Sequence, residues 1–132
     1  MNLKKTFKNL ILLTFFLMVL TIISLFFESA EVAYLYEQLH SSDSDAKVYT
    51  LGIIGLVVFI AYLINLFFLY EFKKIGKPMF LFLFISQFFI LPFIGIIVTD
   101  PFGYIIEGLG WSANAAILVF LYFTPIKKEF EK

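Results

Sequence analysis

Glu107, Gln87 and Asn114 are polar side chains within long apolar runs of the sequence, and they are the residues best placed to do chemistry. An ionisable group in such a run costs about 2.5–3.5 kcal/mol on insertion scales, so it defaults to a functional hypothesis such as proton relay or cation binding. Glu107 also lies near the start of its run, 104–123, where a carboxylate favours the helix N-terminus. Trp111 beside it is typical of a membrane interface. Two interpretations of Glu107 therefore stay open, a site acid and an interfacial anchor, and we favour the anchor.

Gln87 and Asn114 each fall near the midpoint of an apolar run, and a short connection joins the two runs. An amide buried in lipid needs a partner, and a Gln–Asn contact would supply one worth about 0.6–2 kcal/mol. The alternative is that the two amides line a small polar cavity. We favour the structural pairing and keep Glu107, Asn114 and Gln87 together as the candidate polar site within the membrane.

Little else in the sequence could be catalytic or bind a cofactor. The chain has no Cys and one His, it is electrically neutral overall, and all of its ten basic residues are Lys. Thiol chemistry and Arg-based recognition of nucleic acid are therefore excluded. His40 with Asp43 and Asp45 is a weak candidate metal site in a Ser/Asp-rich loop. We expect no catalytic residue, no cofactor, no resident metal and no nucleic-acid partner.

The elements that must position these side chains are membrane helices. Hydrophobic residues make up 61% of the chain and charged residues 15%, against about 45–50% and about 25% in soluble domains. The charges lie in short clusters between uncharged runs long enough to cross a hydrocarbon core about 30 Å thick. We predict an all-α fold, a single domain over residues 1–132 with four transmembrane helices. Its predicted spans are 10–27, 48–70, 79–98 and 104–123.

The first of these runs also has the basic flank of a signal peptide. It is longer than the usual apolar core of such a peptide. Glu28 and Glu31 also occupy positions where a cleavage site needs small residues. We therefore predict an uncleaved first helix.

Two polar segments carry further structural signals. After the first span, Val32, Leu35, Tyr36 and Leu39 form a one-sided helical stripe, which either packs on the protein's own helix ends or docks a partner; we favour the first. Residues 99–103 (TDPFG) fit either a type I turn or a helix start with Asp100 as N-cap and Pro101 at the first helical position.

The lysines predict how the helices face. The head, the loop between the second and third spans, and the tail carry Lys4, Lys5, Lys8, Lys73, Lys74, Lys77, Lys127, Lys128 and Lys132. Short Lys-rich segments stay in the cytoplasm, so we predict an N-in/C-in topology with both termini cytoplasmic. Only Lys47 remains for the outer loops. A chain with this bias should insert in one direction, so any homo-oligomer should be parallel.

The C-terminal third, with ILVFLYFTPIKKEF following GLGWSANAA, resembles the end of an uncharacterised group of small bacterial four-helix integral membrane proteins. The resemblance supports the fold and implies no activity. We separately expect a bacterial inner (cytoplasmic) membrane location. The loops are too short for a soluble catalytic domain. We therefore expect a non-enzymatic accessory or assembly subunit that packs in the bilayer against a larger membrane complex. The alternative is a small transporter or channel using Glu107 with Gln87 and Asn114.

Overall fold

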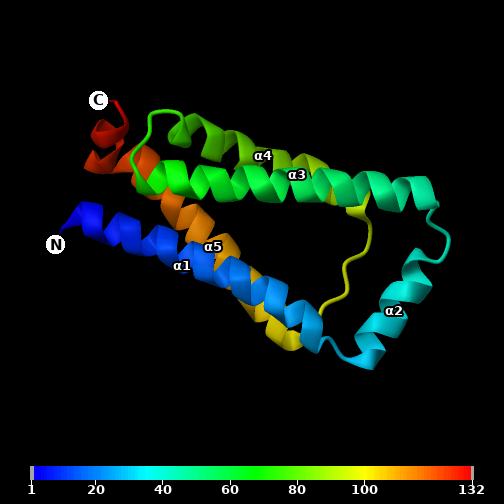
Figure 1. The fold of residues 1–132 in the computed structure, drawn as a ribbon. Helices are drawn as coiled ribbons and strands as arrows, with labels where there is room; N and C mark the ends of the chain where they lie inside the picture. Colours follow the sequence, from blue (N-terminus) through cyan, green and yellow to red (C-terminus); the bar gives the residue numbers. More distant parts are fainter. Residues whose placement is uncertain (1, 132) are drawn as a thin grey trace.

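The computed structural model describes residues 2–131, which are almost entirely helical and include no strand (Figure 1). Four helices are long and apolar enough to cross a membrane, the first of them together with the short turn that follows it. The predicted all-helical chain with four candidate membrane helices is confirmed at this level. In chain order the elements are α1 (Leu3–Ser24), η1 (Leu25–Phe27), α2 (Ala30–His40), α3 (Asp45–Tyr70), α4 (Gly76–Ile94), α5 (Pro101–Phe123) and η2 (Pro125–Phe130).

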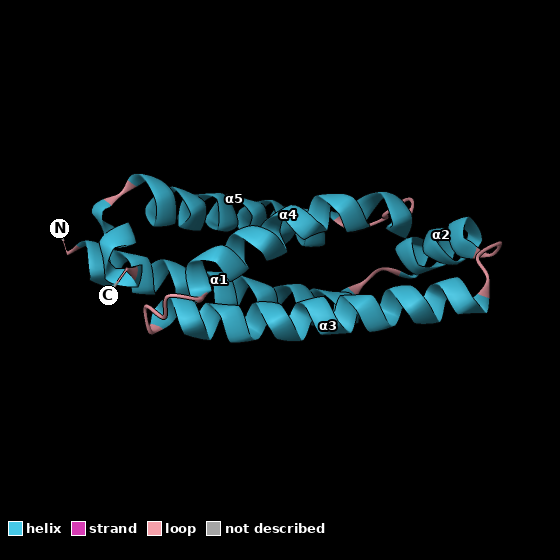
Figure 2. Ribbon diagram, turned by 90° about the horizontal axis from the view of Figure 1, so that it is seen from above, coloured by secondary structure: helices cyan, strands magenta, loops and turns pink. Residues whose placement is uncertain are grey.

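The long helices form two pairs, α1 with α5 and α3 with α4. The two chain ends and the turn between α3 and α4 lie together at one end of the molecule, here called the terminal end (Figure 1). The opposite end, called the α2 end, holds α2 and the connection between α4 and α5. The pairs meet at the terminal end and separate toward the α2 end (Figure 1). Figure 2 likewise places α2 at the far end of α3 from the chain termini.

The hydrophobic core lies at the terminal end, where the pairs meet. Phe7 is fully buried there, and its ring centroid lies 5.8 Å from those of Phe72 and Phe120 and 5.9 Å from that of Phe130. Ile126 and Phe130 belong to this core because η2 folds back onto the bundle. The core residues are Phe7, Ile11, Tyr62, Leu66, Leu69, Phe80, Leu83, Ile117, Leu121, Ile126 and Phe130.

Asn65 is the fully buried polar side chain of this region, at 0% exposure. Its amide donates a 2.8 Å hydrogen bond to the carbonyl of Gly76, the first residue of α4. Gly76 allows the close approach that this bond needs, since a Cβ there would lie 3.1 Å from the carbonyl carbon of Phe68. The contact holds the start of α4 against the end of α3.

Several helix ends differ from the predicted spans. α4 ends at Ile94, where Pro92 has removed a backbone donor and Gly95 turns the chain with φ of +88°. Residues 95–98, which the sequence places in the third span, are therefore non-helical. α5 begins with Asp100 as N-cap, whose carboxylate accepts a 2.6 Å hydrogen bond from the Gly103 amide. Of the two descriptions of this segment, the helix start is the one that forms.

α2 is a separate helix that begins after Ser29, whose hydroxyl accepts a 3.3 Å bond from the Val32 amide. No residue of α2 is buried, and Leu35, Tyr36 and Leu39 of its apolar stripe are 41%, 49% and 44% exposed. The favoured interpretation, that this stripe packs on the protein's own helix ends, is therefore wrong. α2 contacts the connection between α4 and α5 at its C-terminal end, where His40 Nε2 lies 3.0 Å from the Ile96 carbonyl oxygen, and this contact leaves the stripe exposed.

Candidate functional site

A cavity of about 190 Å³ lies between the two helix pairs, and it is called the polar cavity here. It brings together Glu107, Gln87 and Asn114, the three polar residues singled out in the sequence. Side chains from α1, α3, α4 and α5 all contribute to it. The full lining is Thr14, Leu17, Met18, Thr21, Tyr62, Gln87, Glu107, Gly110, Trp111 and Asn114.

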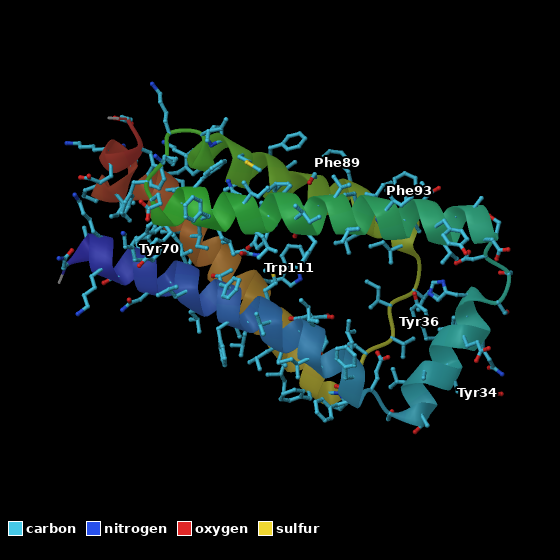
Figure 3. All side chains as sticks on the ribbon, viewed as in Figure 1. Tyr34, Tyr36, Tyr70, Phe89, Phe93 and Trp111 are labelled. Carbon is cyan, nitrogen blue, oxygen red and sulfur yellow. The ribbon has the colours of Figure 1, made fainter. Side chains whose placement is uncertain are left out.

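One face of α5 forms the longest wall of the polar cavity. Glu107, Gly110, Trp111 and Asn114 are spaced i, i+3, i+4 and i+7, so they share one side of the helix. This spacing is visible in the sequence, although Trp111 by itself is read there as an interfacial anchor. In the structure its indole packs on Phe84 and Phe88, with ring centroids 5.9 and 5.6 Å away. These contacts hold Trp111 in the space between the helix pairs (Figure 3).

A second wall comes from α1, the helix paired with α5, and carries Thr14 and Thr21. The Thr14 hydroxyl donates to the Leu10 carbonyl at 2.9 Å, and the Thr21 hydroxyl donates to the Leu17 carbonyl at 3.0 Å. Such bonds to the preceding turn are expected of Thr in an apolar helix. Because these protons are already used, both hydroxyl oxygens can act only as acceptors toward the cavity.

Asn114 has a different partner from the one that the sequence predicts. Its side-chain oxygen accepts a hydrogen bond from the hydroxyl of Tyr62, which is 8% exposed. Gln87 lines the same cavity but has no hydrogen bond to any residue that the structure describes. The predicted Gln87–Asn114 pairing fails because α4 and α5, although consecutive, belong to different helix pairs and touch little. Tyr62 has a longer side chain and reaches across from α3.

Glu107 is only partly buried, and no described residue forms an ion pair or hydrogen bond with it. The described lysines lie in the first two turns of α1, the first turns of α3 and α4, the α3–α4 connection and η2, and none of them lines the cavity. The site therefore presents an acid with no counter-ion from the described chain. Glu107 lines the polar cavity, an arrangement that leaves both interpretations of it, site acid and interfacial anchor, open.

An apolar cavity of about 230 Å³ adjoins the polar one and shares Gln87 and Trp111 with it. It is called the apolar cavity here, and it lies between α3 and α4 toward the α2 end. Its other lining residues are Leu51, Ile54, Gly55, Val58, Ile90, Leu91 and Ile94. The two cavities are therefore neighbours, the first lined in part by polar side chains and the second almost entirely by hydrocarbon.

The predicted metal candidate at His40 is a hydrogen-bonded cluster. His40 Nδ1 lies 2.7 Å from an Asp43 oxygen, and the Lys47 ammonium lies 2.6 Å from the other oxygen of Asp43. His40 Nε2 lies 3.0 Å from the carbonyl oxygen of Ile96, in the connection between α4 and α5. Asp45 takes no part in these contacts. Within residues 2–131 no group of three or more His, Cys, Asp or Glu side chains is arranged to hold a metal.

Both ring nitrogens of His40 face oxygen acceptors, so the imidazolium is the form that satisfies them. The bond to Asp43, and after it the bond to the Ile96 carbonyl, raises the pKa of His40. The Lys47 ammonium, followed by His40, lowers the pKa of Asp43. The cluster is thus a charged link between the end of α2 and the α4–α5 connection.

Comparison with models of protein families, with curated proteins and with solved structures gives no match to this chain.

Proposed function

We propose that the protein is a non-enzymatic accessory or assembly subunit that packs against a larger membrane complex. The observation that carries this proposal is the exposure of α3 at the α2 end. Among residues 48–57, only Leu51 is even partly buried within the chain. A helix of a complete bundle buries one face, so this half of α3 has a free side for a neighbouring helix.

Gly52 marks that side. Tyr49, Gly52, Ile53 and Leu56 lie on one face of α3, and the three large side chains among them are 74%, 64% and 60% exposed. A Cβ at Gly52 would meet nothing within 4 Å. Glycine lowers helix stability by about 1 kcal/mol relative to Ala, and in membranes small residues favour close approach of a second helix. No contact within the described chain uses Gly52 in this way.

The proposed orientation places the terminal end in the cytoplasm of a bacterial cell. Support comes from the lysines gathered at that end, Lys4, Lys5, Lys8, Lys73, Lys74, Lys77, Lys127 and Lys128. The free face of α3 then lies in the outer half of the inner membrane. A partner should therefore present a transmembrane helix at that level.

Photo-crosslinking in native membranes tests the accessory role. A crosslinker at Ile53 should give one discrete adduct, whereas a crosslinker at Phe16, a 56% exposed residue of α1, should give none. Gly52→Leu should abolish both the adduct and co-purification in mild detergent, since it blocks close approach without a clash inside the chain. An adduct of twice the chain's mass would identify a parallel homo-oligomer instead. A chain that leaves its native membrane alone and monodisperse would refute the accessory proposal.

A small transporter or channel is the second candidate. It is favoured by the assembly of Glu107, Gln87 and Asn114 around one cavity. The aromatic core closes the terminal end, so passage of a solute would require the helix pairs to move apart there. Proton or ion flux in proteoliposomes should then be measurable for the native protein and fall in Glu107→Gln. Absent flux, or equal flux in both, would eliminate this candidate.

A further inference from the structure

We infer that the polar cavity binds a primary alkylammonium group, with Glu107 as its counter-ion and the attached hydrocarbon chain in the apolar cavity. The inference concerns a site within the chain, so it does not depend on the accessory role. Three features carry it: the charge of the cavity, its excess of hydrogen-bond acceptors, and the apolar cavity that lies next to it.

Charge comes first. Glu107 has no ion-pair partner among the described residues, and the polar cavity is lined by no basic side chain. A carboxylate at membrane depth is stabilised by a cation that it contacts directly. Trp111, four residues along the same helix face, lines the cavity beside this acid and brings no charge to it.

The hydrogen-bonding groups of the cavity favour a ligand that donates. The hydroxyl protons of Thr14, Thr21 and Tyr62 are used by Leu10, Leu17 and Asn114 in turn, which leaves three hydroxyl oxygens as acceptors. The Glu107 carboxylate accepts only, and the Gln87 amide oxygen accepts as well. Only the amide groups of Gln87 and Asn114 remain as donors. A primary ammonium carries three donors and no acceptor, so it complements this set, whereas a quaternary ammonium has no N–H to offer.

The apolar cavity accounts for the rest of the ligand. It shares Gln87 and Trp111 with the polar cavity, and its remaining walls are aliphatic side chains and Gly55. The apolar cavity is therefore the nearest hydrocarbon-lined space for a chain attached to the ammonium, reached past the side chains of Gln87 and Trp111. The ammonium can come from the headgroup of phosphatidylethanolamine or from a free long-chain amine, and both present the same group.

The test uses Trp111, the single tryptophan of the chain, as a reporter in the cavity. The full-length protein in phosphatidylcholine nanodiscs is titrated at neutral pH with n-octylamine, n-octanol and octyltrimethylammonium. Octylamine should shift the Trp111 emission saturably. Octanol and octyltrimethylammonium should bind about tenfold more weakly or not at all, as expected for loss of charge-assisted hydrogen bonds.

Glu107→Gln should weaken octylamine binding about tenfold or more. The matched control is Glu28→Gln, which neutralises an exposed acid between η1 and α2 and should change nothing. If Glu107→Gln does not fold, the comparison of octylamine with octanol in the native protein still tests the proposal. The proposal would be overturned by equal binding of these two probes or by unchanged binding in a folded Glu107→Gln. It would also be overturned if NaCl displaced octylamine and a bulky organic salt at the same ionic strength did not.

The source of the ammonium is tested by adding phosphatidylethanolamine to the nanodiscs. If the lipid headgroup is the ligand, this lipid should compete with octylamine and remain bound in native mass spectrometry. If a free amine is the ligand, octylamine should bind equally well with and without the lipid. Absence of binding by both the lipid and octylamine would refute the site.

Discussion

Tyr62 on α3 donates its hydroxyl proton to the side-chain oxygen of Asn114 on α5, which joins the two helix pairs beside the polar cavity. The bond lies where the tightly packed core of the terminal end gives way to the open space of the α2 end. The bond also uses the hydroxyl proton of Tyr62, so the Tyr62 oxygen can act only as an acceptor toward the cavity. Stability and ligand binding should therefore both depend on it.

We predict that Tyr62→Phe lowers the free energy of unfolding by about 0.6–2 kcal/mol, the range of side-chain hydrogen bonds between membrane helices. Phe keeps the ring in the core and removes only the donor. Unfolding in mixed micelles gives the free energies of Tyr62→Phe, Asn114→Ala and the double variant. The double variant should lose less than the sum of the singles, because both changes remove the same bond. Strict additivity would show that the bond does not form.

The buried amide of Asn65 should contribute measurably to the stability of the bundle. Asn65→Ala removes the side-chain donor to the Gly76 carbonyl, the contact that holds the start of α4 against α3. A loss of about 0.5–1.5 kcal/mol is expected, the net contribution of one hydrogen bond. Asn9→Ala, which truncates an exposed Asn of α1, is the control and should change stability little. Equal unfolding free energies for the two variants would contradict the contact.

Substitution by Ala should change the stability of the protein in opposite directions at Gly76 and at Gly52. Gly76→Ala places a Cβ 3.1 Å from the backbone of Phe68, so the helices must shift and stability should fall by about 1–3 kcal/mol. Gly52→Ala meets nothing within 4 Å and should raise stability by about 0.5–1 kcal/mol through helix propensity. Thermal unfolding of both variants in the same detergent tests the difference in sign. A loss at Gly52 in the isolated chain would mean that its surroundings are not open.

η2 should contribute to the stability of the whole bundle. Phe130 is 2% exposed and packs edge-on against Phe7, so Phe130→Ala should cost about 3–5 kcal/mol. Phe123→Ala is the matched control, because Phe123 is 84% exposed at the end of α5. Urea or SDS unfolding followed by circular dichroism measures both. If the two variants have the same free energy of unfolding, η2 is not part of the folded core.

The long apolar runs predict the four helices because length and composition alone identify a segment that can cross a membrane. The three polar residues of the cavity are predictable for a related reason, since an acid or amide in such a run stands out. Their partners are not predictable in the same way. Tyr62 looks like any aromatic of α3 until the packing of the helix pairs brings it to Asn114. Thr14 and Thr21 are expected to bond to their own helix, and they do, but their place on the cavity depends on how α1 lies against α5.

The tail shows a similar limit. Ile126 and Phe130 lie in the charged segment IKKEFEK, so the sequence predicts a basic tail rather than a core element. Their spacing of four residues is compatible with one buried face, but only the turn at Thr124 brings them back to Phe7. The Thr124 oxygen accepts a 3.3 Å bond from the Ile126 amide at that turn. Long-range contacts of this kind depend on tertiary packing, which local patterns do not encode.

The link between α2 and the α4–α5 connection should depend on pH. His40 has a pKa raised above its ordinary value of 6.5, chiefly by Asp43 and then by the Ile96 carbonyl, while the charge of Lys47 opposes this in part. A raised pKa means that the stabilisation is complete below pH 6.5 and is lost as the pH rises through the folded pKa. The pKa of Asp43 is lowered from 3.8, so its contribution is present above that value and lost as the pH falls through the folded pKa. The link should therefore be strongest in mildly acidic solution.

Because His40 is the only histidine, its imidazole signals in an NMR titration need no assignment by mutation. The titration should give a pKa above 6.5, and Asp43→Asn should lower it by replacing the carboxylate acceptor with a neutral amide. Hydrogen exchange of the α2 amides should accelerate as the pH rises through the pKa of His40, after correction for the intrinsic pH dependence of exchange. His40→Gln should remove that step, because Gln carries no titrating proton. A pKa of His40 at or below 6.5, or α2 exchange that is the same in native protein and His40→Gln at every pH, would contradict the charged link.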